Sequence, residues 1–158
     1  MSYVAQMRSL SAYNRWADER IVTATETLSL DALQTEAADG RSIVETLAHS
    51  VRAQLWWLSI WTGVPSPLYK HESRAGLQHA FADAHSRIET FATKTDDLEW
   101  ERLVEFSFPG ASALRLPAWQ TFLQVMYHSI QHRAQVAEAL TRLDHSPGDM
   151  DYILWLLR

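Results

Sequence analysis

The chain has 158 residues, seven histidines, no cysteine and a formal net charge of −5. The absence of thiols excludes disulfides, thiolate zinc fingers, iron–sulfur clusters and a cysteine nucleophile, so a transition metal would be held by imidazole and carboxylate groups. The acidic balance argues against a non-specific binder of nucleic acid or of anionic membranes. The length fits one domain over residues 1–158. Neither a signal peptide nor a membrane-spanning stretch is visible, so we expect a cytoplasmic protein.

Apolar residues at helical spacing predict three helices in the first two thirds of the chain. The first covers about Ser2–Leu28, where apolar residues recur in steps near three and four. The second should begin at Ser42, because Ser42 with Glu45 three residues later matches a capping box, and it should end at Gly63. A heptad-like apolar stripe predicts the third helix over about Ser73–Lys94.

The last third of the chain combines an extended segment with two further helices. Leu103–Phe108 alternates and is rich in branched and aromatic residues, which predicts a short extended arm ending at Pro109. Pro117 suits the first position of a fourth long helix, and Asp149 or Asp151 could cap a short C-terminal helix. The predicted fold is therefore all-α, a four-helix bundle with a short extended arm between helices 3 and 4 and a short C-terminal helix.

Two histidines in the fourth helix are the first candidates for metal ligands. His128 and His132 are four residues apart, so they share a helix face and can converge on one ion. By chance, the composition gives roughly 0.3 such pairs, so the spacing is a weak signal alone. Their neighbours Val125 and Val136 turn this face toward the interior, where each imidazole needs a metal, a carboxylate or a carbonyl as partner. His49, on the mostly apolar second helix, is the best third ligand.

Three residues on the same helix faces are candidates for substrate binding. Arg52 and Trp56 share the face of His49, and Gln135 shares the face of the histidine pair. The tryptophans of the second helix are expected mainly in the core or in a dimer contact, with stacking on a substrate as the alternative.

Other polar residues have two interpretations each. Glu45 either accepts a hydrogen bond from an imidazole or serves only its capping box. Arg133 either binds an anionic substrate group or forms a surface ion pair. No catalytic acid or base stands out. The remaining histidines are expected at the surface: His71, His79, His85 and His145.

Three segments together resemble the DinB-like superfamily, which includes YfiT-type proteins and several transferases that use low-molecular-weight thiols. Leu10–Asp18 resembles its Y-N-x-W-A-N segment, Gly40–His49 its S-I-x-x-x-L-x-H segment, and His128–Gln135 its H-x-x-x-H-R-G-Q segment. Ala134 stands where glycine is usual, and Asp18 replaces a common asparagine.

The resemblance implies a divalent metal, with zinc, nickel, iron or manganese as candidates, bound by His49, His128 and His132. It also implies frequent homodimers. Three neutral ligands leave an open position where a bound water or thiol is acidified. We therefore expect a metal-dependent transferase that joins a small thiol, such as bacillithiol or mycothiol, to a small-molecule substrate. The alternatives are a non-catalytic, stress-associated metal-binding bundle and a metal-dependent hydrolase.

Overall fold

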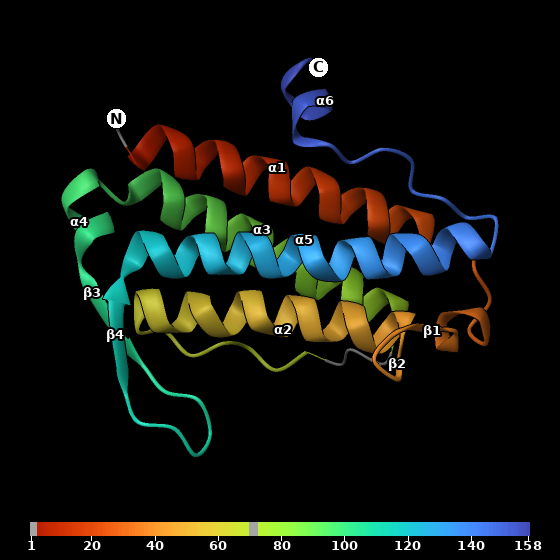
Figure 1. Cartoon of the computed structure of the whole chain (residues 1–158), viewed down its shortest axis with the longest axis horizontal. Coiled ribbons are helices and arrows are strands. Elements are labelled where there is room, and N and C mark those ends of the chain that lie inside the picture. The colour runs from red at the N-terminus through yellow and green to blue at the C-terminus, as the bar shows by residue number, and fades with distance from the viewer. Residues whose placement is uncertain (1–2, 70–72) are drawn as a thin grey trace.

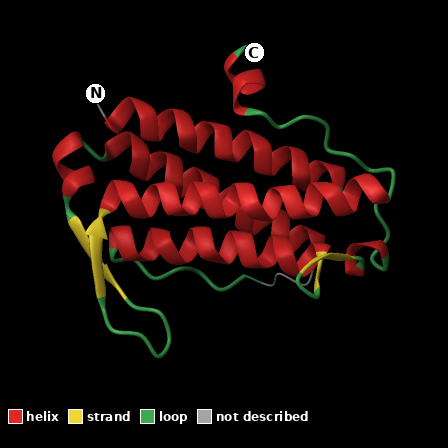
Figure 2. Ribbon diagram, in the orientation of Figure 1, coloured by secondary structure: helices red, strands yellow, loops and turns green. Residues whose placement is uncertain are grey.

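Four long helices packed side by side make up most of the structure, a computed structural model that describes residues 3–69 and 73–158. Figure 1 shows the four arranged as a bundle, and Figure 2 shows how little strand accompanies them. This all-α architecture confirms the predicted fold. The helices are α1 (Tyr3–Ala24), α2 (Ile43–Thr62), α3 (Arg74–Lys94) and α5 (Ala118–Arg142).

Short elements join and flank the long helices. The predicted extended arm is one strand of a hairpin, in which β3 (Leu103–Phe106) pairs antiparallel with β4 (Leu114–Pro117). The hairpin extends past one end of α2 in Figure 1. The predicted C-terminal helix is present as α6 (Tyr152–Leu156). The sequence did not predict β4. It also did not predict η1 (Ala32–Gln34), β1 (Glu36–Ala38), β2 (Arg41–Ser42) and α4 (Asp97–Glu101).

Local capping interactions set the helix boundaries. The Ser42 side chain accepts a hydrogen bond from the Glu45 N–H (3.3 Å), and Glu45 accepts one from the Ser42 N–H (2.8 Å), so the capping box is confirmed. Glu45 therefore serves this cap, and its alternative role beside an imidazole is not realised. Pro117 was expected as the first helical residue, but its ψ of 143° is extended, and it precedes α5 as the last residue of β4.

Two apolar clusters fill the interior at different levels of the bundle. One cluster includes Ile21, Val51 and Ala84, and the other, toward the arm, is strongly aromatic and includes Trp100 and Phe122. None of the described helices has the length and apolar character that a membrane span requires.

A buried polar network lies between these clusters and links all four long helices. The Asp18 carboxylate of α1 accepts hydrogen bonds from Arg133 of α5 (2.7 Å) and Gln54 of α2 (2.9 Å). His85 of α3 lies 3.0 Å from the same carboxylate, and Arg133 also donates to Asn14 (2.6 Å). Burial alone would raise the pKa of Asp18, but the Arg133 guanidinium and the His85 ring outweigh it and lower that pKa.

This network corrects two predictions. His85 was expected at the surface and is buried against Asp18. Arg133 was expected to bind substrate or to form a surface ion pair, and instead it forms a buried ion pair. His79 is exposed as expected, and His145 is half-buried beside Thr27. The prediction for His71 falls outside the described residues.

Replacing Arg133 with methionine should lower the free energy of unfolding by about 3–5 kcal/mol, because the Asp18 charge would stay buried without its partner. Urea unfolding followed by far-UV circular dichroism measures this loss.

Arg142→Met is the matched control on the same helix. Arg142 pairs with Glu138 at 2.7 Å, but its side chain is exposed, so the loss should be about 0–1 kcal/mol. Equal losses in the two variants would mean that the buried network contributes no more than a surface ion pair.

Candidate metal centre

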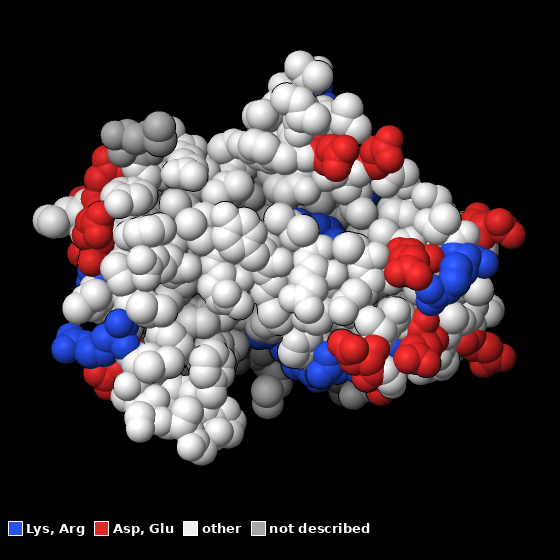
Figure 3. Space-filling view, viewed as in Figure 1, with Lys and Arg blue, Asp and Glu red and all other residues white. Residues whose placement is uncertain are grey.

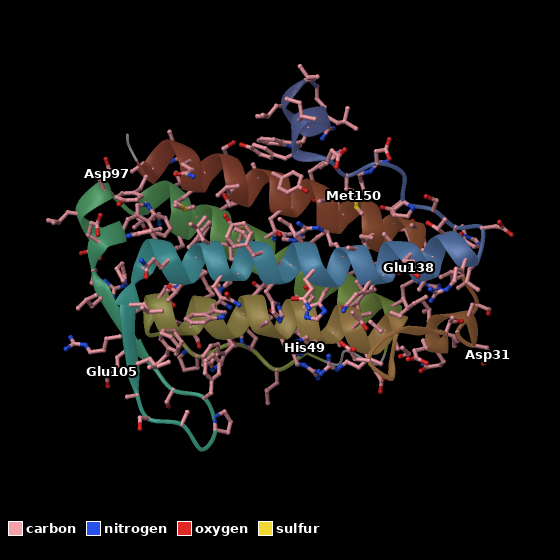
Figure 4. The ribbon with its side chains drawn as sticks, viewed as in Figure 1. Asp31, His49, Asp97, Glu105, Glu138 and Met150 are labelled. Carbon is pink, nitrogen blue, oxygen red and sulfur yellow. The ribbon has the colours of Figure 1, made fainter. Side chains whose placement is uncertain are left out.

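Three imidazoles converge where α2 and α5 run beside each other. His49 comes from the second turn of α2 and is labelled in Figure 4, and His128 and His132 come from successive turns of α5. The Nε2 atom of His128 lies 3.2 Å from Nε2 of His49 and 3.1 Å from Nε2 of His132. The three ligand atoms all lie within 4.8 Å of one another. The structure thus brings together the three residues that the sequence singled out.

The two spacings around His128 fit a shared cation. Two imidazole nitrogens bound to one zinc ion at 2.0–2.1 Å, with bond angles between octahedral and tetrahedral, lie about 2.8–3.4 Å apart. Both distances from Nε2 of His128 fall in this range. A neutral imidazole Nε2 can donate to one neighbour at most, whereas a cation can accept lone pairs from all three rings.

The surroundings keep two of these rings neutral. Burial, with the neighbouring His132 and His49 rings and the Arg41 charge, lowers the pKa of His128 to about 4. The pKa of His49 is lowered as well, first by burial and then by His132 and two arginines, Arg41 and Arg52. Metal ligation requires unprotonated imidazole, so both rings are ready to bind an ion at neutral pH.

The Nδ1 atoms of His132 and His128 differ in their hydrogen bonding. Nδ1 of His132 donates to Oε1 of Gln135 at 2.7 Å, which fixes the ring and leaves its Nε2 lone pair free. Nδ1 of His128 is buried and has no hydrogen-bond partner among the described residues. An unsatisfied buried group costs about 1–3 kcal/mol, and six other buried side-chain atoms of the described residues share this feature, so it does not by itself mark a site.

A cavity of about 550 Å³ opens beside the histidines. His49 and His128 form one end of it, α2 and α5 form two sides, and the β3–β4 hairpin forms the third. Sequence reasoning missed this wall because β4 was not predicted.

The three residues predicted to bind substrate occupy different places. Trp56 lines the cavity, whereas neither Arg52, which is exposed, nor Gln135, which contacts His132, lies in its wall. Arg41, whose charge acts on two of the rings, was also missed, although it stands immediately before the N-cap of the helix that carries His49. The substrate-binding roles of Arg52, Trp56 and Gln135 remain predictions.

The bundle and its histidine group define a helical protein with a candidate site for a divalent cation. The chain matches the family model described as the DinB family over residues 1–156, and it therefore belongs to the DinB family. The resemblance in the three sequence segments is thereby confirmed. A comparison with curated proteins finds no match.

Replacing Gln135 with alanine should weaken zinc binding about 10–100-fold, because His132 would lose the acceptor that fixes its ring. Competition with a chromophoric chelator, on protein stripped of metal and reloaded with zinc, measures the affinity. Gln131→Ala is the control, because Gln131 is exposed on the same helix. Equal affinities in the two variants would show that Gln135 does not orient the ring.

Proposed function

We propose that the chain binds one divalent metal ion through His49, His128 and His132, and that it is a metal-dependent transferase with a low-molecular-weight thiol as nucleophile. The observation that carries the proposal is the convergence of three imidazole Nε2 atoms at the end of an open cavity. Zinc, nickel, iron and manganese are the candidate ions, since imidazole ligands alone do not select among them.

The metal, when bound, would lower the pKa of a thiol or a water molecule at its open position. In the transferase reaction the thiol loses its proton to solvent, sulfur forms a bond to the electrophilic carbon, and the leaving group departs with the electrons of the broken bond. The chain has no cysteine, so the sulfur must arrive with a cosubstrate. The neutral rings would hold the ion, Gln135 orients one of them, and Trp56, which lines the cavity, would contact what enters it.

The partners that we propose are small molecules and a second copy of the chain, in the cytoplasm. The net charge of −5 disfavours nucleic acid. In Figure 3, charged residues gather toward the two ends of the visible face and its middle is mostly uncharged. Tyr127 and Ile130 are exposed on α5, and such apolar surface is typical of interfaces.

Sedimentation equilibrium should give twice the mass of the chain, and a monomer at all concentrations would contradict the dimer.

Protein purified without a nickel column should contain close to one equivalent of metal, and His128→Ala should lose it because two imidazoles form a much weaker site. Metal analysis by mass spectrometry measures the content, and circular dichroism shows whether the helices persist. His79→Ala, an exposed histidine of α3, is the control and should retain the metal. If the stripped wild-type protein takes up none of the four metals, the metal site is wrong.

Turnover separates the transferase from its alternatives. The metal-loaded protein should conjugate chlorodinitrobenzene to at least one of bacillithiol, mycothiol and glutathione, and product formation should require the thiol. Absorbance of the thioether product measures the rate. Metal binding without turnover would leave the non-catalytic bundle, and hydrolysis of an ester substrate without any thiol would indicate the hydrolase.

A further inference from the structure

The inner face of the β3–β4 hairpin is only half packed. Val104 pairs with Leu116 and Phe106 pairs with Leu114, so these four side chains share one face. Val104 and Phe106 are 2% and 6% exposed, as expected for a face that covers a core. Leu116 and Leu114 are 39% and 47% exposed although they lie on the same face. The two leucines therefore face a gap and not packed protein.

That gap is the cavity that ends at the histidines. Leu114 and Leu116 line it together with Trp56 and Phe108, whose rings stack at 5.8 Å between centroids and 28° between planes. His49 and His128 close its inner end, on α2 and α5. The apolar wall and the candidate metal ligands thus belong to one continuous space.

The lining carries no formal charge that could bind an anion or a cation. Within the described part of the chain, the residues of the wall include no aspartate, glutamate, lysine or arginine. Its polar side-chain groups, apart from the histidines and the indole N–H groups of Trp56 and Trp57, belong to Thr121 and two glutamines. The Thr121 hydroxyl is already engaged by Trp61 and by the Ala118 carbonyl. Gln120 and Gln124 are exposed and have no hydrogen-bond partner among the described residues.

These features define the chemistry of the occupant. Along the wall away from the histidines, a charged group would lose its hydration without gaining an ionic partner. A flat apolar molecule, by contrast, would cover the two leucines and stack on the aromatic pair, and both contacts are favourable. A cavity of this volume lies within the usual range for small-molecule sites.

We propose that this cavity binds an uncharged aromatic small molecule, with its ring system against Trp56, Phe108 and the two leucines and its reacting end toward His49 and His128. Free carboxamides of Gln120 and Gln124 accept or donate hydrogen bonds to its polar groups. This inference rests on the proposed function, in which the molecule is the electrophile that the thiol attacks. It assigns the specificity of that site to the hairpin.

A pair of fluorescent probes tests the class of ligand without any turnover. N-phenylnaphthylamine is neutral, and anilinonaphthalene sulfonate has the same ring system with one added negative charge. Titrated into the full chain stripped of metal, the neutral probe should saturate at one equivalent with blue-shifted emission and should quench tryptophan fluorescence. The anionic probe should bind at least about tenfold more weakly than the neutral probe.

Two leucine variants test the place of binding. Leu114→Asp introduces a carboxylate into the wall and should weaken the neutral probe by about tenfold or more. Leu103→Asp is the matched control, because Leu103 is 50% exposed in the same hairpin but lies on its opposite face, paired with Pro117. Circular dichroism should show the same helix content in both variants.

The outcomes separate this inference from the proposed function. A lack of saturable binding, a preference for the anionic probe or equal losses in the two variants would overturn the cavity assignment, even if thiol conjugation is observed. Binding that disappears as the protein self-associates would mean that a second copy covers the cavity, and would also overturn it. Neutral-probe binding that depends on Leu114, in a protein without turnover, would support the cavity and contradict only the transferase.

Discussion

The buried ion pair between Asp18 and Arg133 constrains the whole bundle. Two charges taken out of water need complete pairing, and here the partners come from α1, α2, α3 and α5 at one level between the two apolar clusters. Arg133 immediately follows His132, and successive helical residues point about 100° apart. When Arg133 turns toward α1, the rotation of α5 is fixed, and His132 and His128 are directed toward His49 on α2. The ion pair therefore sets the geometry of the candidate metal centre without contacting it.

The sequence predicted those features whose partners are close in the chain. The capping box at Ser42 joins residues three apart, and the histidine pair joins residues four apart, so both could be recognised from spacing alone. Arg133 and Asp18 are 115 residues apart. The pattern of one helix cannot reveal such a partner on another, and this is why Arg133 and His85 were misjudged. His49 was selected for its place on the mostly apolar second helix, and the family resemblance then implied the same three ligands.

In the β3–β4 hairpin, too, the sequence predicted one partner and not the other. The alternation in Leu103–Phe108 predicted β3. In that strand the inward residues Val104 and Phe106 are apolar and buried, and the residues between them are exposed. Its partner β4 ends in a proline and lies mostly exposed, so it lacks the alternating burial of an ordinary strand. β4, the strand that was not predicted, supplies Leu114 and Leu116 to the cavity. The apolar–polar alternation of Leu114, Arg115 and Leu116 is present, but a strand of four residues gives too short a pattern to be recognised from the sequence alone.

The site therefore divides into parts held by different forces. The imidazoles lie on two long helices whose rotation and level are fixed by buried charges and two apolar clusters. The cavity wall lies on a hairpin that joins the aromatic cluster through Val104 and Phe106 and leaves its other inner side chains uncovered. Leu114 and Leu116 lie on the hairpin, whereas the ion pair and the histidines lie on the long helices. A fold arranged in this way can change the molecule it accepts while its candidate metal ligands stay in place.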